Sequence, residues 1–161
     1  MSSRETDRTV RLSVLDRLQA GAAKSVSLSE SVRALREAVR RDLDWLLNTR
    51  RIAEPAPDRY PEVQKSLYHY GLRDITSLSG DSDSARRRLL RDVEECIELF
   101  EPRLMNVRVT AYDARAHSER RQIRFHIEGL LKMDPDPERV SFDTTLETSS
   151  GRIEVAGESN A

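Results

Sequence analysis

Apolar side chains recur at helical intervals between residues 27 and 51, which predicts the clearest helix of the chain. The stripe consists of Val32, Leu35, Val39, Leu43, Leu46 and Leu47. Ser27 and Glu30 have the spacing of a capping box, with Ser29 as an alternative cap. Trp45 falls beside the stripe and is expected at the edge of the core.

A second long helix is predicted from Asp83 or Ser84 to Phe100, because apolar residues again follow a helical period. Its buried face is expected to hold Leu89, Val93, Cys96, Ile97 and Phe100. Between the two, the segment 60–71 predicts a shorter helix. Pro61 suits its first position, Gly71 suits its end, and Val63, Leu67 and Tyr70 would form its apolar face.

The period changes to two after Arg103, which predicts strands in the segments 104–112, 122–131, 140–147 and 152–155. In the first of them, Met105, Val107, Val109 and Ala111 are expected to share one face. Helices followed by strands predict an α+β fold, with N-terminal helices packed on an antiparallel sheet of three to four strands. The expected organisation is an arm and linker at 1–26, one domain at 27–156 and a tail at 157–161.

The junction between the second long helix and the first strand holds Glu101, Pro102 and Arg103. Proline ends the helix near Phe100, and in an extended chain residues two apart point to the same side. Glu101 and Arg103 are therefore expected to project together. The pair would either hold the corner together locally or present both charges to a partner protein.

Composition narrows the range of functions. The 161 residues carry a net charge of -1, which gives no general attraction to nucleic acid or anionic lipid. Among the 27 basic residues only Lys24, Lys65 and Lys132 are lysines. This excess of arginine fits either a coding bias or the enrichment of arginine at protein interfaces. Neither an apolar leader nor a membrane-spanning stretch is evident, so a protein of the reducing cytosol is expected.

The sequence contains no recognised motif for catalysis, metal binding or nucleotide binding. The single cysteine, Cys96, excludes an intrachain disulfide and fits a core position. His69, His117 and His126 lie far apart, and no glycine-rich phosphate-binding pattern occurs. His69 is expected to be a surface or packing residue, and His126 a solvated strand residue. No cofactor, metal, small-molecule substrate or catalytic residue is therefore predicted, although a peptidoglycan hydrolase with paired carboxylates remains an alternative.

The order of these features resembles the TssE family of type VI secretion baseplate subunits and its relatives in contractile phage baseplates. The segments that carry the resemblance are LSVLDRL (12–18), SVRALREAVRRDLDWLLNTRR (31–51), YPEVQKSLYHYGLRDITSLSG (60–80) and IELFEPRLMNVRV (97–109). The first segment and the LNTRR run favour the secretion branch over the phage branch. Part of the family carries a "lysozyme" label, but this sequence shows no set of catalytic residues that would support it.

The resemblance implies a non-catalytic assembly protein. Such a subunit would join the baseplate wedge through TssF and TssG, contact other baseplate subunits, and template the first ring of the TssB–TssC sheath. Its fold would be similar to the interlocking domain of the sheath, whose sheet edges accept strands from neighbours. Glu101, Pro102 and Arg103 would anchor the wedge contact. The expected location is the cytoplasmic face of the inner membrane.

Overall fold

The computed structural model describes residues 28–54, 56–57, 59–75, 83–112, 122–134 and 136–157, together with residues 14 and 18. The helices in these ranges are α2 (Leu28–Asn48), α3 (Pro61–Gln64), the 3-10 helix η1 (Leu67–His69) and α4 (Asp83–Phe100). The strands are β1 (Leu104–Ala111), β2 (Gln122–Leu131), β3 (Glu138–Glu147) and β4 (Arg152–Val155). The predicted arm at 1–26 lies almost wholly outside the described residues, as does Ser27.

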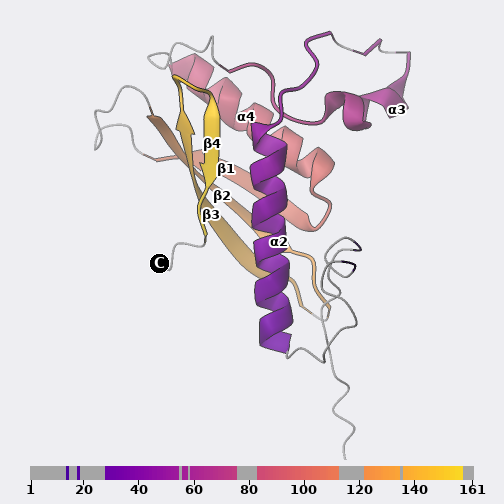
Figure 1. The fold of residues 1–161 in the computed structure, drawn as a ribbon, viewed down its shortest axis with the longest axis vertical. Helices are drawn as coiled ribbons and strands as arrows, with labels where there is room; N and C mark the ends of the chain where they lie inside the picture. Colours follow the sequence, from indigo (N-terminus) through magenta and orange to yellow (C-terminus); the bar gives the residue numbers. More distant parts are fainter. Residues whose placement is uncertain are drawn as a thin grey trace, which may run out of the picture.

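The four strands form one sheet in the order β1-β2-β3-β4, and every neighbouring pair is antiparallel. Consecutive strands that are neighbours in space need only short antiparallel connections. The predicted α+β class, with helices preceding an antiparallel sheet, is confirmed. In Figure 1, α2 runs across the direction of α4, and α3 lies at the end of the molecule away from the sheet.

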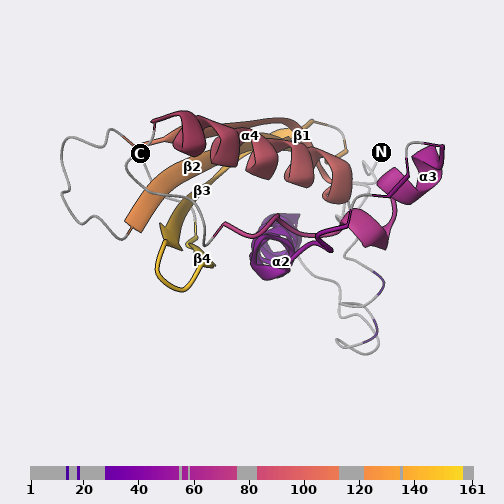
Figure 2. The ribbon, with the colours of Figure 1, turned by 90° about the horizontal axis from the view of Figure 1, so that it is seen from above.

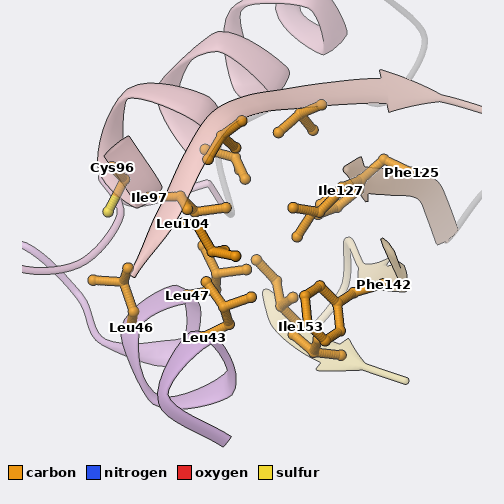
Figure 3. Packing of buried hydrophobic residues seen from close by; sticks show 14 of the residues in the cluster. Leu43, Leu46, Leu47, Cys96, Ile97, Leu104, Phe125, Ile127, Phe142 and Ile153 are labelled. Atoms are coloured by element: carbon orange, nitrogen blue, oxygen red, sulfur yellow. The ribbon is translucent and has the colours of Figure 1, made fainter. Parts of the chain in front are cut away.

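One core holds the molecule together, built from α2, α4 and a single face of the sheet (Figure 3). Burial alternates along β2, where Ile123, Phe125, Ile127 and Leu131 are buried and the residues between them are more exposed. α4 packs against β1, and α2 packs against β4 and α4 (Figure 2). The stripes predicted for the two long helices therefore meet the inward face of the sheet.

The first strand departs from the predicted alternation because it contains a β-bulge. The pairing of β1 with β2 shifts by one residue between Met105 and Arg108, and Asn106 has a positive φ of 52°. An extra residue in one strand moves the following side chains to the opposite face. Leu104 is consequently buried before the bulge, whereas Met105 is only half-buried. Ala111, which was also expected to face the core, is exposed.

The single helix predicted for residues 60–71 is wrong, because the segment divides into α3 and η1. The Ser66 hydroxyl donates to the Val63 carbonyl and accepts from the Tyr68 amide, which replaces the helical hydrogen bonds at this point. Leu67, expected on an apolar face, is 81% exposed.

Gly71 joins this segment to the end of α2. It has a φ of 97°, and a Cβ at this position would lie 2.2 Å from the carbonyl oxygen of Thr49. Only glycine fits both the conformation and the close approach. The Leu72 amide then donates to the Thr49 carbonyl at 2.9 Å, and the Arg51 amide donates to the Leu72 carbonyl at 2.8 Å. This short connection holds Tyr70 beside Phe100, with ring centroids 5.3 Å apart.

Candidate partner-docking site

The candidate site begins where α4 ends. The Glu101 amide donates the last helical hydrogen bond, to the Ile97 carbonyl at 2.8 Å, and Pro102 then has no amide hydrogen to continue the ladder. The Leu104 amide donates to the Glu101 carbonyl at 3.1 Å, which closes a turn through Pro102 and Arg103. The predicted end of the helix at Phe100 is confirmed. The junction is a turn and not the extended segment that was expected.

This turn brings the Glu101 and Arg103 side chains together, as predicted. The Arg103 guanidinium donates from Nε to Glu101 Oε1 at 2.6 Å and from Nη2 to Glu101 Oε2, and the Arg103 amide donates to the same carboxylate at 3.2 Å. Two parallel hydrogen bonds are the geometry that an arginine and a carboxylate form best. The Glu101 side chain is only 5% exposed. The pair is therefore a largely desolvated ion pair and not a solvated surface contact.

A third residue, Asp42 of α2, completes the cluster and was missed by the sequence analysis. Arg103 Nη2 donates to Asp42 Oδ2 at 2.6 Å, and the neighbouring Arg41 donates to Asp42 Oδ1 at 3.1 and 3.2 Å. Asp42 is 61 residues from Arg103 in the chain, so no local pattern links the two. One indication of a special role for Asp42 was present in the sequence: this carboxylate lies three residues after Val39 and four before Leu46, at the margin of the apolar stripe. We name Asp42, Glu101 and Arg103 the corner cluster.

The corner cluster keeps its arginine charged. The hydrogen bonds and charge of Glu101 raise the pKa of Arg103, the contribution of Asp42 acts in the same direction, and burial opposes both. Two carboxylates around one guanidinium leave the corner cluster with a formal charge of -1. Arg41, held against Asp42, balances that charge.

An open groove of about 490 Å³ lies beside the corner cluster. Its lining comes from the end of α2, the segment after η1 and the helix–strand corner: Arg41, Asp42, Trp45, Leu46, Tyr70, Phe100, Glu101, Pro102 and Arg103. Trp45 is 52% exposed, and the Arg41 guanidinium lies 5.1 Å from the centroid of its ring. Pro102 is also exposed. Tryptophan, tyrosine and arginine, which line this groove together, are among the residue types that dominate binding energy at protein interfaces.

Other positions singled out in the sequence lie away from this groove or inside the core. Cys96 is buried and donates to the Gly71 carbonyl at 3.5 Å, and burial raises the pKa of its thiol to about 11. A thiol with this pKa is protonated at neutral pH, which opposes a nucleophilic role. His69 is a buried packing residue whose Nδ1 lies 3.3 Å from the Val63 carbonyl oxygen. His117 lies outside the described residues.

His126 differs from the solvated histidine that was expected. It is half-buried on the outer face of the sheet, where its Nδ1 lies 2.8 Å from Asp143 Oδ1. The Tyr112 hydroxyl donates to the same carboxylate oxygen, and Glu128 lies 3.5 Å from His126 Nε2. Within the described ranges no group of three or more His, Cys, Asp or Glu side chains is arranged to hold a metal ion. No helix of those ranges has the length and apolar character that a membrane span requires.

In the part of the chain that the structure describes, an open groove thus lies beside a largely desolvated charge cluster. A family model described as baseplate wedge protein gp25 matches residues 33–136, about two thirds of the chain. The chain therefore belongs to the gp25 family of baseplate wedge proteins, and the predicted resemblance is confirmed at the level of the family. The match includes every residue of the corner cluster. No curated protein matches the chain.

Proposed function

We propose that this protein is the TssE-type subunit of a type VI secretion baseplate. In this role it is non-catalytic, joins the wedge proteins TssF and TssG, and templates the first ring of the TssB–TssC sheath. Its place of action is the cytoplasmic face of the inner membrane. The family membership supports a baseplate subunit, and the LSVLDRL and LNTRR segments favour the secretion branch.

The observation that carries the wedge contact is the position of the corner cluster beside an exposed Trp45. A side chain from a partner that enters the groove would contact Trp45 and Pro102 and would exclude water from Arg103. Loss of one member of a charge pair at such an interface typically costs roughly 2 to 5 kcal/mol. Glu101, Pro102 and Arg103 accordingly remain the proposed anchors, and Asp42, Arg41 and Trp45 join them.

The test is co-purification with tagged TssF–TssG from the same gene cluster. Trp45→Ala is the most informative variant, because a half-exposed side chain contributes little to the core and its loss leaves the fold intact. We expect at least a tenfold loss of binding, since a buried aromatic anchor is worth more than about 1.4 kcal/mol. Tyr60→Ala is the matched control, because Tyr60 is a similarly exposed aromatic outside the groove.

Arg103→Ala and Glu101→Ala extend the test to the corner cluster, with circular dichroism to establish that each variant is folded. Folded variants that lose TssF–TssG support docking at the corner. Trp45→Ala binding as tightly as the wild type would contradict a docking role for the groove. A wild-type protein that fails to co-purify would contradict the secretion-baseplate assignment.

The gp25 description itself favours a second candidate, a wedge subunit of a phage-like contractile particle. The groove would serve the same kind of contact in that particle. Pull-down from cells that encode both systems separates the two candidates. A subunit of the phage-like particle would recover the wedge proteins of that particle, whereas a TssE-type subunit would recover TssF–TssG.

A further inference from the structure

The outward face of α4 carries charges that are divided by sign along the helix. Arg87, Arg88 and Arg91 are exposed in its first half, and Glu95 and Glu98 are exposed in its second half. Figure 2 shows α4 along one outer side of the molecule. Within the described ranges, none of these five side chains forms an ion pair.

This division of charge is unfavourable for an isolated helix. The helix dipole is positive at the N-terminal end, so basic residues in the first half and acidic residues in the second half add to it. Arg87 and Arg91 are four residues apart and Glu95 and Glu98 three apart, and like charges at these spacings repel each other. A neighbouring antiparallel helix reverses both effects when its charges are divided in the same way. The face therefore suits an antiparallel helix.

The spacing of the charges is symmetric about residue 93. Arg91 and Glu95 each lie two residues from this level, and Arg88 and Glu98 each lie five residues from it. These separations are about 3 Å and about 7.5 Å along the helix axis. A twofold axis at the level of residue 93 therefore sets Arg91 beside Glu95 of a second copy, and Arg88 beside Glu98 of that copy. Each of the two ion pairs then forms twice.

The same twofold axis also provides a contact for Leu99. The Leu99 side chain is 43% exposed and lies six residues after residue 93, whereas Arg87 lies six residues before it. The aliphatic part of an arginine side chain covers apolar surface while its guanidinium stays in water. One symmetry operation thus matches the exposed apolar residue at the end of α4 as well as the two ion pairs.

We propose that α4 is a contact between two copies of this protein, which pair as an antiparallel, twofold-symmetric helix dimer through Arg88–Glu98 and Arg91–Glu95. This inference does not depend on the type VI assignment. A helix of another protein would need complementary charges, but it would not require the symmetry about residue 93. With 18 residues, α4 is about 27 Å long. A contact of this size made of exposed ion pairs is weak and is screened by salt.

Sedimentation equilibrium of the purified protein tests the pairing. We expect a dimer at about 20 mM salt, with a dissociation constant at least tenfold weaker at about 500 mM salt. The double variant Arg88→Glu/Arg91→Glu should weaken it at least tenfold at low salt, with circular dichroism to establish that the variant is folded. Arg108→Glu/Arg124→Glu is the matched control, because it makes the same change in net charge at exposed arginines of the sheet. It should remain within threefold of the wild type.

Charge reversal on the other half of the helix tests which residues pair. Glu95→Arg/Glu98→Arg should also lose the homodimer, and its mixture with Arg88→Glu/Arg91→Glu should form a heterodimer in which all four ion pairs return. Its mixture with the control double variant should form none. A single chain that carries all four reversals should dimerise as the wild type does, since each pair is only inverted.

Three results would overturn the inference. The first is a wild-type protein that stays monomeric at about 1 mM concentration and low salt. The second is a dimer that Arg88→Glu/Arg91→Glu leaves intact. The third is a loss in both double variants that neither the mixture nor the fourfold variant restores. A monomeric wild type whose recovery of TssF–TssG is lost in Arg88→Glu/Arg91→Glu would identify a wedge protein as the occupant in place of a second copy.

Discussion

Two polar clusters of this protein differ in the elements that they connect and in how far water reaches them. The corner cluster joins α2 to the α4–β1 turn, across 61 residues of chain, through side chains that are at most 27% exposed. The cluster of Tyr112, His126 and Asp143 joins β2 and β3, strands that the sheet already pairs, and Tyr112 in it is 48% exposed. A charge cluster is expected to matter most where it joins elements that no backbone ladder pairs and where little water competes for it.

The largest expected effect is that of Arg103→Ala. The substitution leaves Glu101, with its 5% exposed side chain, and Asp42 without their shared cation. Breaking a buried pair on one side typically costs 3–5 kcal/mol, and the partial exposure of Arg103 reduces this to about 2–4 kcal/mol. Urea unfolding at neutral pH measures the loss. Arg124→Ala, an exposed arginine of β2, is the control and should change stability by less than about 0.5 kcal/mol.

Equal losses for these two arginine variants would show that the corner cluster stabilises no more than an exposed arginine, which would remove the contrast. A loss at Arg103 that Glu101→Gln partly restores in the double variant would sharpen it. In that variant the unpaired buried charge is gone, and only the lost packing and hydrogen bonds remain.

The second expected effect is a loss of stability at alkaline pH that comes from the buried thiol of Cys96 in α4. Burial raises the pKa of the Cys96 thiol to about 11 from an ordinary value near 9. Between these values the folded protein keeps a proton that the unfolded chain releases. The stabilisation is therefore complete below pH 9 and is lost as the pH rises to 11, by about 2–3 kcal/mol. Urea unfolding at pH 8 to 11 measures it.

Cys96→Ala should remove the slope between pH 9 and 10, because alanine carries no proton to lose. Burial also raises the pKa of Tyr70, so some loss above pH 10 is expected to persist in this variant. An unchanged slope between pH 9 and 10 would show that Cys96 does not titrate as its burial requires.

The smallest expected effect is that of Tyr112→Phe on the outer face. The hydrogen bond to Asp143 raises the pKa of Tyr112, but both groups remain accessible to water, which replaces the bond when it is lost. We expect a change of less than about 0.5 kcal/mol in the free energy of unfolding at neutral pH. Thermal unfolding that shows a loss as large as that of Arg103→Ala would contradict the comparison.

Several features of the fold were predictable because their causes are local. Pro102 ends α4 wherever the rest of the chain lies, and the helix predicted from Asp83 or Ser84 to Phe100 agrees with α4. The apolar stripe of α2 and the alternation in β2 and β3 follow directly from the geometry of helix and strand. The proximity of Glu101 and Arg103 was also predicted, since residues two apart across a turn or an extended segment meet easily.

Other features depended on contacts that the sequence does not display. The bulge at Asn106 shifts the register of β1 against β2, and only the pairing itself reveals it. The division of the 60–71 segment follows from Ser66 bonding to its own backbone and from Gly71 lying against Thr49. A helical propensity of that segment did not outweigh these tertiary constraints.

The two long helices, the positions of the four strands and the charge pair at the corner could be predicted from the sequence, because each arises from interactions among near neighbours in the chain. The tertiary structure is what brings Asp42 to that pair, places Trp45 at a groove beside it, and sets Asn48 against the backbone of Ile153 at the β4 edge of the sheet. These outcomes require residues tens of positions apart to meet, and the packing of α2 and α4 on the sheet determines which of them do.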